Sequence, residues 1–384
     1  MIIPALLNRG LTLEDAREYN IIGCVEPQKA GKTEGWHDAA FFNMCRPLEL
    51  VFANGMDQGE MVGIPTGDVT QMATFDEFYD AYKKQMEYCI SLLVNADNAI
   101  DVAHAKRCPL PFLSSMIDDC IKKGKDYNAG GARYNTSYIQ GVGIGTISDA
   151  LSSIKFNVFD NQKFTMKELI DAMNDDFKGH EDILNLVKNK TPKYGNDDDY
   201  ADDIMVSVFN EYKDYITGRP TTRGGVYHVD MLPTTCHVYF GDVMIASPNG
   251  RLAHIPLSEG ISPEKGADIN GPTAVVKSCS KMNHCETGGT LLNQKFTPAA
   301  IAGEKGIDNL AALIRSYFAM NGHHIQFNVI DRQTLIEAQK NPEEYKELIV
   351  RVAGYSDYFR NLDKPLQNEI IERTEQSFGG CGCC

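Results

Sequence analysis

The sequence has 384 residues, of which 43% are hydrophobic, and a formal net charge of -15. A chain of this size can bury a substantial core in one large domain or two ordinary ones. No basic block offsets the acidity, which argues against a nucleic-acid or anionic-membrane surface and favours a small-molecule partner. The apolar runs fall far short of the roughly 20 residues of a membrane span, and the start lacks the features of a signal peptide. We therefore expect a cytoplasmic protein.

The eleven cysteines form two groups. Eight are scattered without the paired spacing of a zinc site, so we expect reduced thiols packed as small hydrophobes and no bound metal. Cys381, Cys383 and Cys384 form a dense tail. A tetrahedral metal site there would need a fourth ligand from elsewhere, so we expect residues 379–384 to be disordered.

Near the start, a short helix over residues 11–19 is predicted, with Thr12 and Asp15 spaced as a cap. It leads into an apolar run that ends in Cys24, Val25 and Glu26. In an extended segment residues i and i+2 point to the same side, so Cys24 and Glu26 are predicted to face one site. A nucleophile or radical carrier beside an acid/base is a catalytic pair.

The next stretch, residues 31–43, contains the only Trp and the pair His37 and Asp38. This pair is interpreted either as a cap with a polar turn or as part of a site. A helix-like apolar segment is expected to follow, through residue 50. Gly-Lys-Thr at 31–33 is similar to the end of a phosphate loop, but Glu26 stands where that loop needs glycine, which excludes it.

A long scaffold helix is predicted over residues 74–107, because apolar residues recur there at spacings of three and four behind a Thr74–Glu77 capping box. Further helices are expected at about 113–123, from 165, at 196–217, 307–319, 333–340 and 364–376. Strands are expected within 225–246, around a break at 232–235, at 324–330, and before Gly354, with a long connection at 247–272. Helices alternating with short apolar strands indicate an α/β architecture with one main core. The glycines of 141–145 lack the spacing of a dinucleotide-binding turn.

Gly354 ends the last of these strands, inside the stretch Arg-Val-Ala-Gly-Tyr-Ser at 351–356. A glycine in such a place is commonly a loop residue that needs conformational freedom. The alternative is that Gly354 is itself the reagent. An α-carbon without a side chain, flanked by an amide nitrogen and a carbonyl, can hold a planar, delocalised radical that a Cβ would crowd. The choice depends on whether the chain supplies a partner for that radical.

Together, Gly-Cys-Val-Glu-Pro at 23–27 and the stretch at 351–356 resemble the cysteine loop and the glycyl-radical loop of glycyl radical enzymes, and the similarity extends over residues 2–378. The resemblance implies an α/β barrel of parallel half-sheets surrounded by helices, with the two loops meeting at its centre. It implies that a separate S-adenosylmethionine-dependent activating enzyme with a 4Fe–4S cluster removes hydrogen from Gly354. The radical would pass to Cys24, whose thiyl takes hydrogen from the substrate, and no bound cofactor is expected.

Family members carry about as much sequence again before the cysteine loop, so this chain resembles a C-terminal half. We expect residues 1–330 to form a partial barrel and residues 331–378 a glycyl radical domain. A missing N-terminal half or complementary chain is expected to complete the pocket, with a homodimer as the complete form. The alternative of another class is an inactive fragment or a subunit of a split enzyme.

The branch of the family can be narrowed further. Formate-forming acyltransferases use two adjacent cysteines, whereas Val25 follows Cys24 here, which disfavours that branch. Resemblance to the eliminating branch implies Glu26 as general acid/base. It implies these substrate-binding residues: Asp38, His37 and Thr235. Segments 232–238 and 288–294 resemble the hydroxyproline dehydratase group, so dehydration of trans-4-hydroxy-L-proline is expected first. Choline trimethylamine-lyase, diol or glycerol dehydratase and arylacetate decarboxylase remain open.

Overall fold

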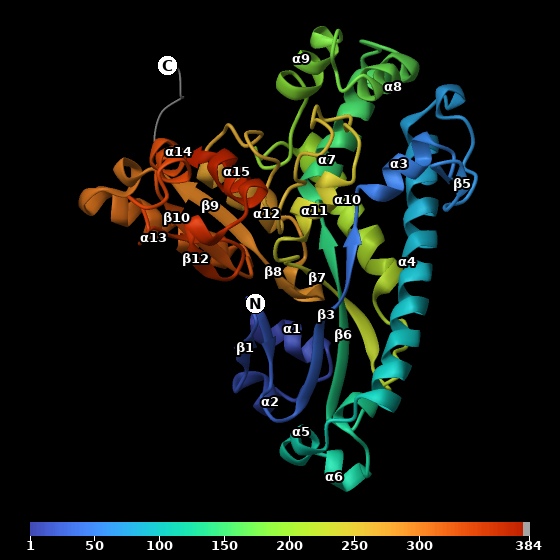
Figure 1. Ribbon diagram of the computed structural model, residues 1–384, viewed down its shortest axis with the longest axis vertical. Helices are drawn as coiled ribbons and strands as arrows, with labels where there is room; N and C mark the ends of the chain where they lie inside the picture. Colours follow the sequence, from blue (N-terminus) through green and yellow to red (C-terminus); the bar gives the residue numbers. More distant parts are fainter. Residues whose placement is uncertain (379–384) are drawn as a thin grey trace.

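The computed structural model describes residues 1–378, and its centre is a parallel sheet of strand order β3-β6-β7-β8 (Figure 1). Its strands are β3 (Thr33–Asn43), β6 (Tyr134–Val142), β7 (Val226–Met231) and β8 (Thr287–Thr290). In Figure 1 the long helix α4 (Phe75–Arg107) runs along one side of this sheet, and the chain from β9 onward forms a lobe on the other side. The expected parallel half-sheets with surrounding helices are confirmed.

The lobe is built on a second parallel sheet of order β10-β9-β13. Its strands are β9 (Leu292–Phe296), β10 (Ile325–Val329) and β13 (Glu375–Gln376). Only Leu291 separates β8 from β9, so the two sheets follow one another along the chain. The lobe's helices are α13 (Gly303–Ala319), α14 (Arg332–Lys340) and α15 (Lys364–Glu372), and its hairpin joins β11 (Ile349–Arg351) to β12 (Ser356–Tyr358).

The remaining elements surround the first sheet. The helices are α1 (Ile2–Asn8), α2 (Leu13–Arg17), α3 (Arg46–Phe52), α5 (Pro111–Met116), α6 (Cys120–Lys123), α7 (Ile144–Ser153), α8 (Met166–Asn174), α9 (Glu181–Asn189), α10 (Asp199–Ile216), α11 (Cys236–Asp242) and α12 (Pro272–Ser280). The antiparallel pairs are β1 (Asn20–Ile22) with β2 (Glu26–Gln28) and β4 (Met56–Asp57) with β5 (Glu60–Met61). Within residues 1–378, no helix has the length and apolar character needed to cross a membrane.

Three of the predicted helix starts are confirmed together with their caps. Thr12 accepts a hydrogen bond from the Asp15 amide at 3.2 Å, and Thr74 accepts one from the Glu77 amide at 3.2 Å. Thr165 and Glu168 form a reciprocal capping box at the start of α8. These ends depend on residues within one turn of each other, which is why the sequence predicts them well.

Three predicted elements are wrong. Residues 39–43 are not helical but continue β3, where they pair with β6. Residues 236–242 form helix α11 rather than a strand. The helix expected at 113–123 is split into α5 and α6, and Asp119 between them has a φ of 75°. Short apolar runs do not distinguish a buried strand from a helix, so tertiary pairing decided these segments.

Strand β6 was missed altogether, although it lies in the middle of the sheet between β3 and β7. Seven of its residues, from Thr136 to Val142, are buried. A strand covered on both faces does not show the alternation of apolar and polar residues by which strands are recognised in a sequence.

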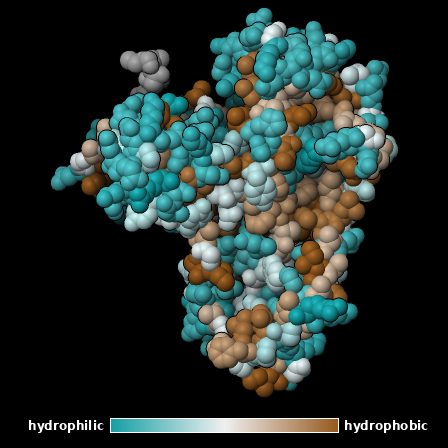
Figure 2. All heavy atoms as spheres, in the orientation of Figure 1, coloured by the Kyte–Doolittle hydropathy of each residue, from teal (hydrophilic) through white to brown (hydrophobic). Residues whose placement is uncertain are grey.

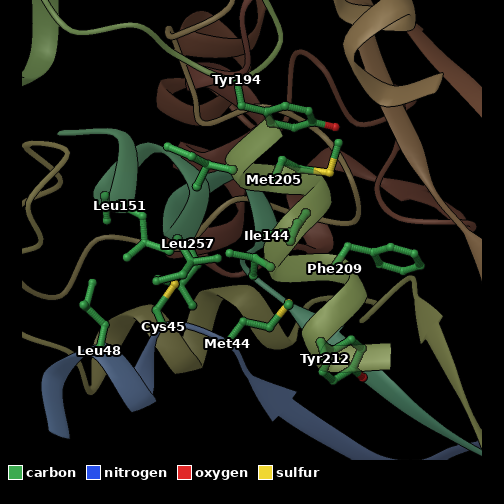
Figure 3. Packing of buried hydrophobic residues seen from close by; sticks show 14 of the residues in the cluster. Met44, Cys45, Leu48, Ile144, Leu151, Tyr194, Met205, Phe209, Tyr212 and Leu257 are labelled. Carbon is green, nitrogen blue, oxygen red and sulfur yellow. The ribbon is translucent and has the colours of Figure 1, made fainter. Parts of the chain in front are cut away.

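The main core lies between the sheet and helices α4, α7 and α10, and Figure 3 shows Phe209 and Tyr212 of α10 beside Ile144 of α7. The Tyr212 hydroxyl donates to the Ile139 carbonyl of β6 at 2.6 Å. A separate apolar cluster includes Val25, Leu232, Val352 and Ala353. Apolar burial thus holds the predicted cysteine and glycine loops together.

Candidate active site

The cysteine loop is closed by its own carboxylate. Oε2 of Glu26 accepts hydrogen bonds from the backbone amides of Cys24 at 2.8 Å and Val25 at 2.6 Å. Gly23 makes this turn with a φ of 58°, and a Cβ there would lie 3.1 Å from Glu26 Oε2. The left-handed backbone therefore favours glycine, and a Cβ would also press against this carboxylate.

The glycine loop is the turn of the β11–β12 hairpin. Its ends are joined by a 2.9 Å hydrogen bond from the Val352 amide to the Tyr355 carbonyl. Gly354 has a φ of 79°, and its amide donates to Oε1 of Gln326 on β10 at 3.1 Å. A Cβ added at Gly354 would overlap Cβ and Sγ of Cys24. Gly354 is thus both in the left-handed region and in direct contact with the cysteine.

The fold brings together two loops that lie 330 residues apart (354 minus 24). Cys24 Sγ donates to the Ala353 carbonyl at 3.3 Å, next to Gly354. The place of an L side chain on a glycine is taken by its pro-S hydrogen. Because a Cβ in that place would overlap Cys24, the pro-S hydrogen of Gly354 points at this cysteine. The site therefore presents a C–H bond directly to a thiol.

The thiol of Cys24 is held in its neutral form. Burial, together with the negative charges of Glu26 and Asp38, raises the pKa of Cys24 to about 11. A reactive thiolate would instead need nearby positive charge. The environment of Cys24 thus suits a carrier of hydrogen atoms better than a nucleophile.

A bulge in β3 aims two consecutive residues at the site. Trp36 pairs with Ser137 and Ala40 with Ile139, so residues 37–39 of β3 stand opposite the single residue Tyr138 of β6. His37 stacks on Tyr138, with ring centroids 4.1 Å apart and an interplanar angle of 4°. Bulges of this kind redirect side chains next to active sites.

The side chain of His37 is buried, with 6% of its surface exposed. Its Nδ1 is 2.9 Å from Oδ2 of Asp230 on β7. Burial lowers the pKa of His37 to about 3 and raises the pKa of Asp230 well above its ordinary value. The imidazole of His37 is therefore neutral. Among the described residues, Nε2 of His37 has no hydrogen-bond partner.

Asp38 lies on the open side and is fixed by Gln140 of β6. The fully buried Gln140 donates from Nε2 to Asp38 Oδ1 at 3.0 Å and to the His37 carbonyl at 3.1 Å. Its Oε1 accepts from the Leu232 amide at 3.0 Å, in the segment that leads to Thr235. One buried amide thus fixes both Asp38 and the approach to Thr235.

Thr235 is half-buried and stands just before helix α11. The charge of Asp38 raises the pKa of two thiols, Cys24 and the neighbouring Cys236, although burial is the larger cause in each. The charge of Asp38 thus reaches both the cysteine loop and the segment of Thr235. Gln140, which bonds to Asp38 and to the Leu232 amide, brings Asp38 close to the segment that leads to Thr235.

Glu26 has the environment of a proton acceptor. It is 4% exposed, and burial, followed by the negative charge of Asp230, raises its pKa. A carboxylate with a raised pKa takes up protons more readily at neutral pH. Glu26 can therefore hold the cysteine loop with Oε2 and still accept a proton.

Three further residues of the site, Gln140, Asp230 and Gln326, were not predicted from the sequence. Each is a buried polar residue on a strand, with at most 6% of its surface exposed. A polar side chain within an apolar run is a signal for a functional or structural hydrogen bond. Since β6 was not recognised, that signal could not be used for Gln140.

Residues 1–378 contain no group of three or more His, Cys, Asp or Glu side chains that could hold a metal ion. The cysteines at 381, 383 and 384 lie outside the described residues, as does the disorder predicted for them.

Comparison with known proteins agrees with this geometry. The family described as pyruvate formate lyase-like matches residues 1–241, and the family described as glycine radical matches residues 257–360. The chain is 58% identical to trans-4-hydroxy-L-proline dehydratase of Clostridioides difficile over 98% of its own length and 48% of that relative.

Two solved structures are similar to the whole of this fold. Hydroxyproline dehydratase from Clostridioides difficile, with trans-4-hydroxy-L-proline bound, superposes with a TM-score of 0.96 at 58% identity, covering 98% of this chain and 48% of that one. The glycerol-bound B12-independent glycerol dehydratase from Clostridium butyricum superposes with a TM-score of 0.95 at 52% identity, with the same coverage of 98% and 48%. The chain therefore spans about half the length of the relatives it matches.

Proposed function

Because this chain belongs to the glycyl radical enzymes, we propose that Gly354 stores the radical and that Cys24 forms the thiyl that attacks the substrate. The observation that carries the proposal is the contact between them, in which the pro-S hydrogen of Gly354 points at Cys24. A separate S-adenosylmethionine-dependent activating enzyme with a 4Fe–4S cluster installs the radical. Residues 1–330 supply the partial barrel and residues 331–378 the glycyl radical domain.

The proposed steps conserve atoms and electrons. The Gly354 radical takes the hydrogen atom of the Cys24 thiol, and the resulting thiyl takes a hydrogen atom from a substrate carbon. Glu26 then removes a proton from the substrate and passes it to the departing hydroxide, which leaves as water. The product radical regains a hydrogen atom from Cys24, and the thiyl recovers the hydrogen of Gly354. The net change is the loss of one water molecule.

The proposed substrate is trans-4-hydroxy-L-proline. Support comes from the 58% identity to the dehydratase of that amino acid. Asp38, on the open side of the bulge, orients the substrate together with Thr235. His37 is buried in its pair with Asp230, so we propose that it acts by supporting the wall of the pocket.

A second candidate is dehydration of glycerol or a related diol. The glycerol dehydratase structure, at 52% identity, supports it. Both candidates use the same hydrogen-atom relay and general base, and they differ in the groups that bind the substrate. This chain matches 48% of the length of each of these relatives, and we propose that the remaining half supplies part of the pocket.

An anaerobic assay decides between them. The activated protein is tested on trans-4-hydroxy-L-proline, glycerol, propane-1,2-diol and choline, with the remaining half of the relatives' fold supplied in the same polypeptide or as a second one. We expect dehydration of hydroxyproline. Turnover of glycerol or the diol alone would establish the second candidate, and release of trimethylamine from choline would contradict both.

The matched control is Cys24→Ser. An O–H bond is too strong for the relay, so this variant is expected to keep the glycyl radical and lose all turnover. Retained turnover in Cys24→Ser would mean that another thiol carries the hydrogen atom.

A further inference from the structure

We propose that Arg373, held by Glu369, is a positioning residue that clamps the radical loop against Cys24 and ties it to helix α11 of the substrate pocket. The inference rests on the proposed role of Gly354 and adds the side chains that keep this glycine in contact with the thiol.

The clamp begins at the end of α15. Arg373 donates from Nε to Oε1 of Glu369 at 3.1 Å and from Nη2 to Oε2 at 2.9 Å. Such a two-pronged pair fixes the plane of the guanidinium as well as its position. The exposed fractions are 7% for Arg373 and 1% for Glu369, so solvent does not compete for these bonds.

The remaining nitrogen of the guanidinium reaches the loop. Nη1 of Arg373 donates to the carbonyl of Val352 at 3.0 Å and to that of Arg351 at 3.4 Å. These carbonyls stand two and three residues before Gly354. The Val352 carbonyl has a second donor, Nδ2 of Asn293, at the longer distance of 3.4 Å. Arg373 thus contributes the shorter, charge-assisted bond to the turn that carries Gly354.

Glu369 links the clamp to the pocket. Its Oε2 lies 3.8 Å from Nε2 of the fully buried His237 in α11, two residues after Thr235. Burial favours the protonated carboxyl, but Arg373 and His237 outweigh it and hold the pKa of Glu369 well below its ordinary range. Glu369 is therefore ionised. A chain of charged and polar contacts runs from α11 to the radical loop.

Removing the guanidinium has a predictable consequence. Glu369 would be left as a buried charge without its partner, which is strongly unfavourable. The Val352 carbonyl would keep only its longer bond to Asn293. The turn would then leave its place more often, and Gly354 would lose contact with Cys24.

The first test is amide hydrogen exchange in the protein before activation. The variants are Arg373→Met, Arg373→Lys and Glu369→Gln. The matched control is Arg360→Gln, because within residues 1–378 the ion pair of Arg360 is a 3.8 Å exposed contact with Glu343. We expect exchange at residues 352–355 to rise at least about tenfold in the first three, which is the effect of losing a charged hydrogen bond. Exchange in α4 should stay unchanged. Rates at 352–355 within about twofold of wild type in Arg373→Met would overturn the proposal.

The second test is turnover divided by the number of glycyl spins, in the activated protein completed as above. We expect this ratio to fall at least about tenfold in Arg373→Met. It should fall less in Arg373→Lys, which keeps the positive charge but cannot form the two-pronged pair with Glu369. A merely structural role would lower the yield of folded protein without changing turnover per spin. An unchanged ratio with a normal radical would overturn the proposal.

The two tests separate this proposal from the function on which it rests. If wild type forms no glycyl radical, the proposed function fails, while the exchange experiment still decides whether Arg373 clamps the turn. If Arg373→Met does not fold, Glu369→Gln provides the same comparison, because it removes the charge that orients the guanidinium.

Discussion

His37 and Asp38 are consecutive in the sequence, yet both side chains bond to partners on one face of the sheet. Their partners, Asp230 and Gln140, are register neighbours on β7 and β6. The bulge in β3 makes this possible, since in a regular strand the two would point to opposite faces. It places the buried pair of His37 and Asp230 next to the exposed carboxylate of Asp38.

Replacing Gly354 with alanine is expected to abolish the glycyl radical. The new Cβ would overlap Cys24, and the φ of 79° would cost about 1 to 2 kcal/mol of folding stability. Electron paramagnetic resonance after activation checks the first effect and thermal unfolding the second. A doublet that persists in Gly354→Ala would exclude this residue as the radical site. In wild type, oxygen should cleave the activated chain at Gly354.

The contact with Cys24 also predicts which hydrogen of Gly354 is exchanged. Protein labelled with glycine deuterated in the pro-S position should lose deuterium from Gly354 during turnover in ordinary water, because the thiol exchanges its own hydrogen with solvent. Glycine deuterated in the pro-R position should keep its label. Mass spectrometry of the peptide around residue 354 measures both, and loss from the pro-R position would contradict the geometry.

The thiol of Cys24 should react slowly with iodoacetamide at pH 8, because only the thiolate reacts and the pKa is about 11. The rate should rise with pH up to that value. Asp38→Asn removes one of the negative charges that raise the pKa, so the rise should begin at lower pH. The exposed Cys108 serves as the internal control for reagent access. An identical pH profile in wild type and Asp38→Asn would show that Asp38 does not act on this thiol.

Glu26→Gln should leave the radical intact and slow dehydration by about 10² to 10⁴, the usual contribution of a general acid or base. The amide oxygen of glutamine can still accept from the Cys24 and Val25 amides, so the loop is expected to stay in place. Turnover per spin in a single-turnover assay provides the measurement. A loss of radical in place of a loss of rate would mean that Glu26 serves mainly to hold the loop.

Gln140→Leu should raise the KM for the substrate about tenfold or more, since Asp38 and the Leu232 amide each lose a buried partner. Gln140 makes no hydrogen bond to the two loops of the relay, so the radical yield should match wild type. Gln140→Glu keeps an acceptor for Leu232 but places a second carboxyl beside Asp38. Its activity should recover as the pH falls and one of the two carboxyls is protonated. A KM unchanged in both variants would remove Gln140 from the pocket.

An apolar area at the lower tip of the molecule in Figure 2 belongs to α5 and α6 and the turn between them. Phe112, Met116 and Ile121 are 78%, 55% and 76% exposed there. A single helix was predicted at about 113–123 in this part of the chain. In the structure the chain breaks at Asp119, and the two short helices α5 and α6 carry these exposed side chains.

The sequence alone determined what depends on short stretches of chain. The helix caps at Thr12, Thr74 and Thr165 were predicted because each depends on residues within one turn. The pair of motifs around Cys24 and Gly354 indicated the family. The chemistry of each motif belongs to a single residue: the thiol of Cys24, and the α-carbon of Gly354 between an amide and a carbonyl. Both residues could therefore be recognised without knowing the fold.

Only the tertiary structure decided how those residues are arranged. The bulge in β3, the amide of Gln140 and the clamp of Arg373 all depend on partners that are distant in sequence, such as Asp230, Leu232 and Val352. Buried parallel strands show no alternation of apolar and polar residues in the sequence. Strand β6 and its polar residue Gln140 could therefore not be predicted from it. A hydrogen bond across 92 residues, as between Gln140 and Leu232, leaves no periodic pattern in the chain. It exists because the packed sheet brings the two strands side by side.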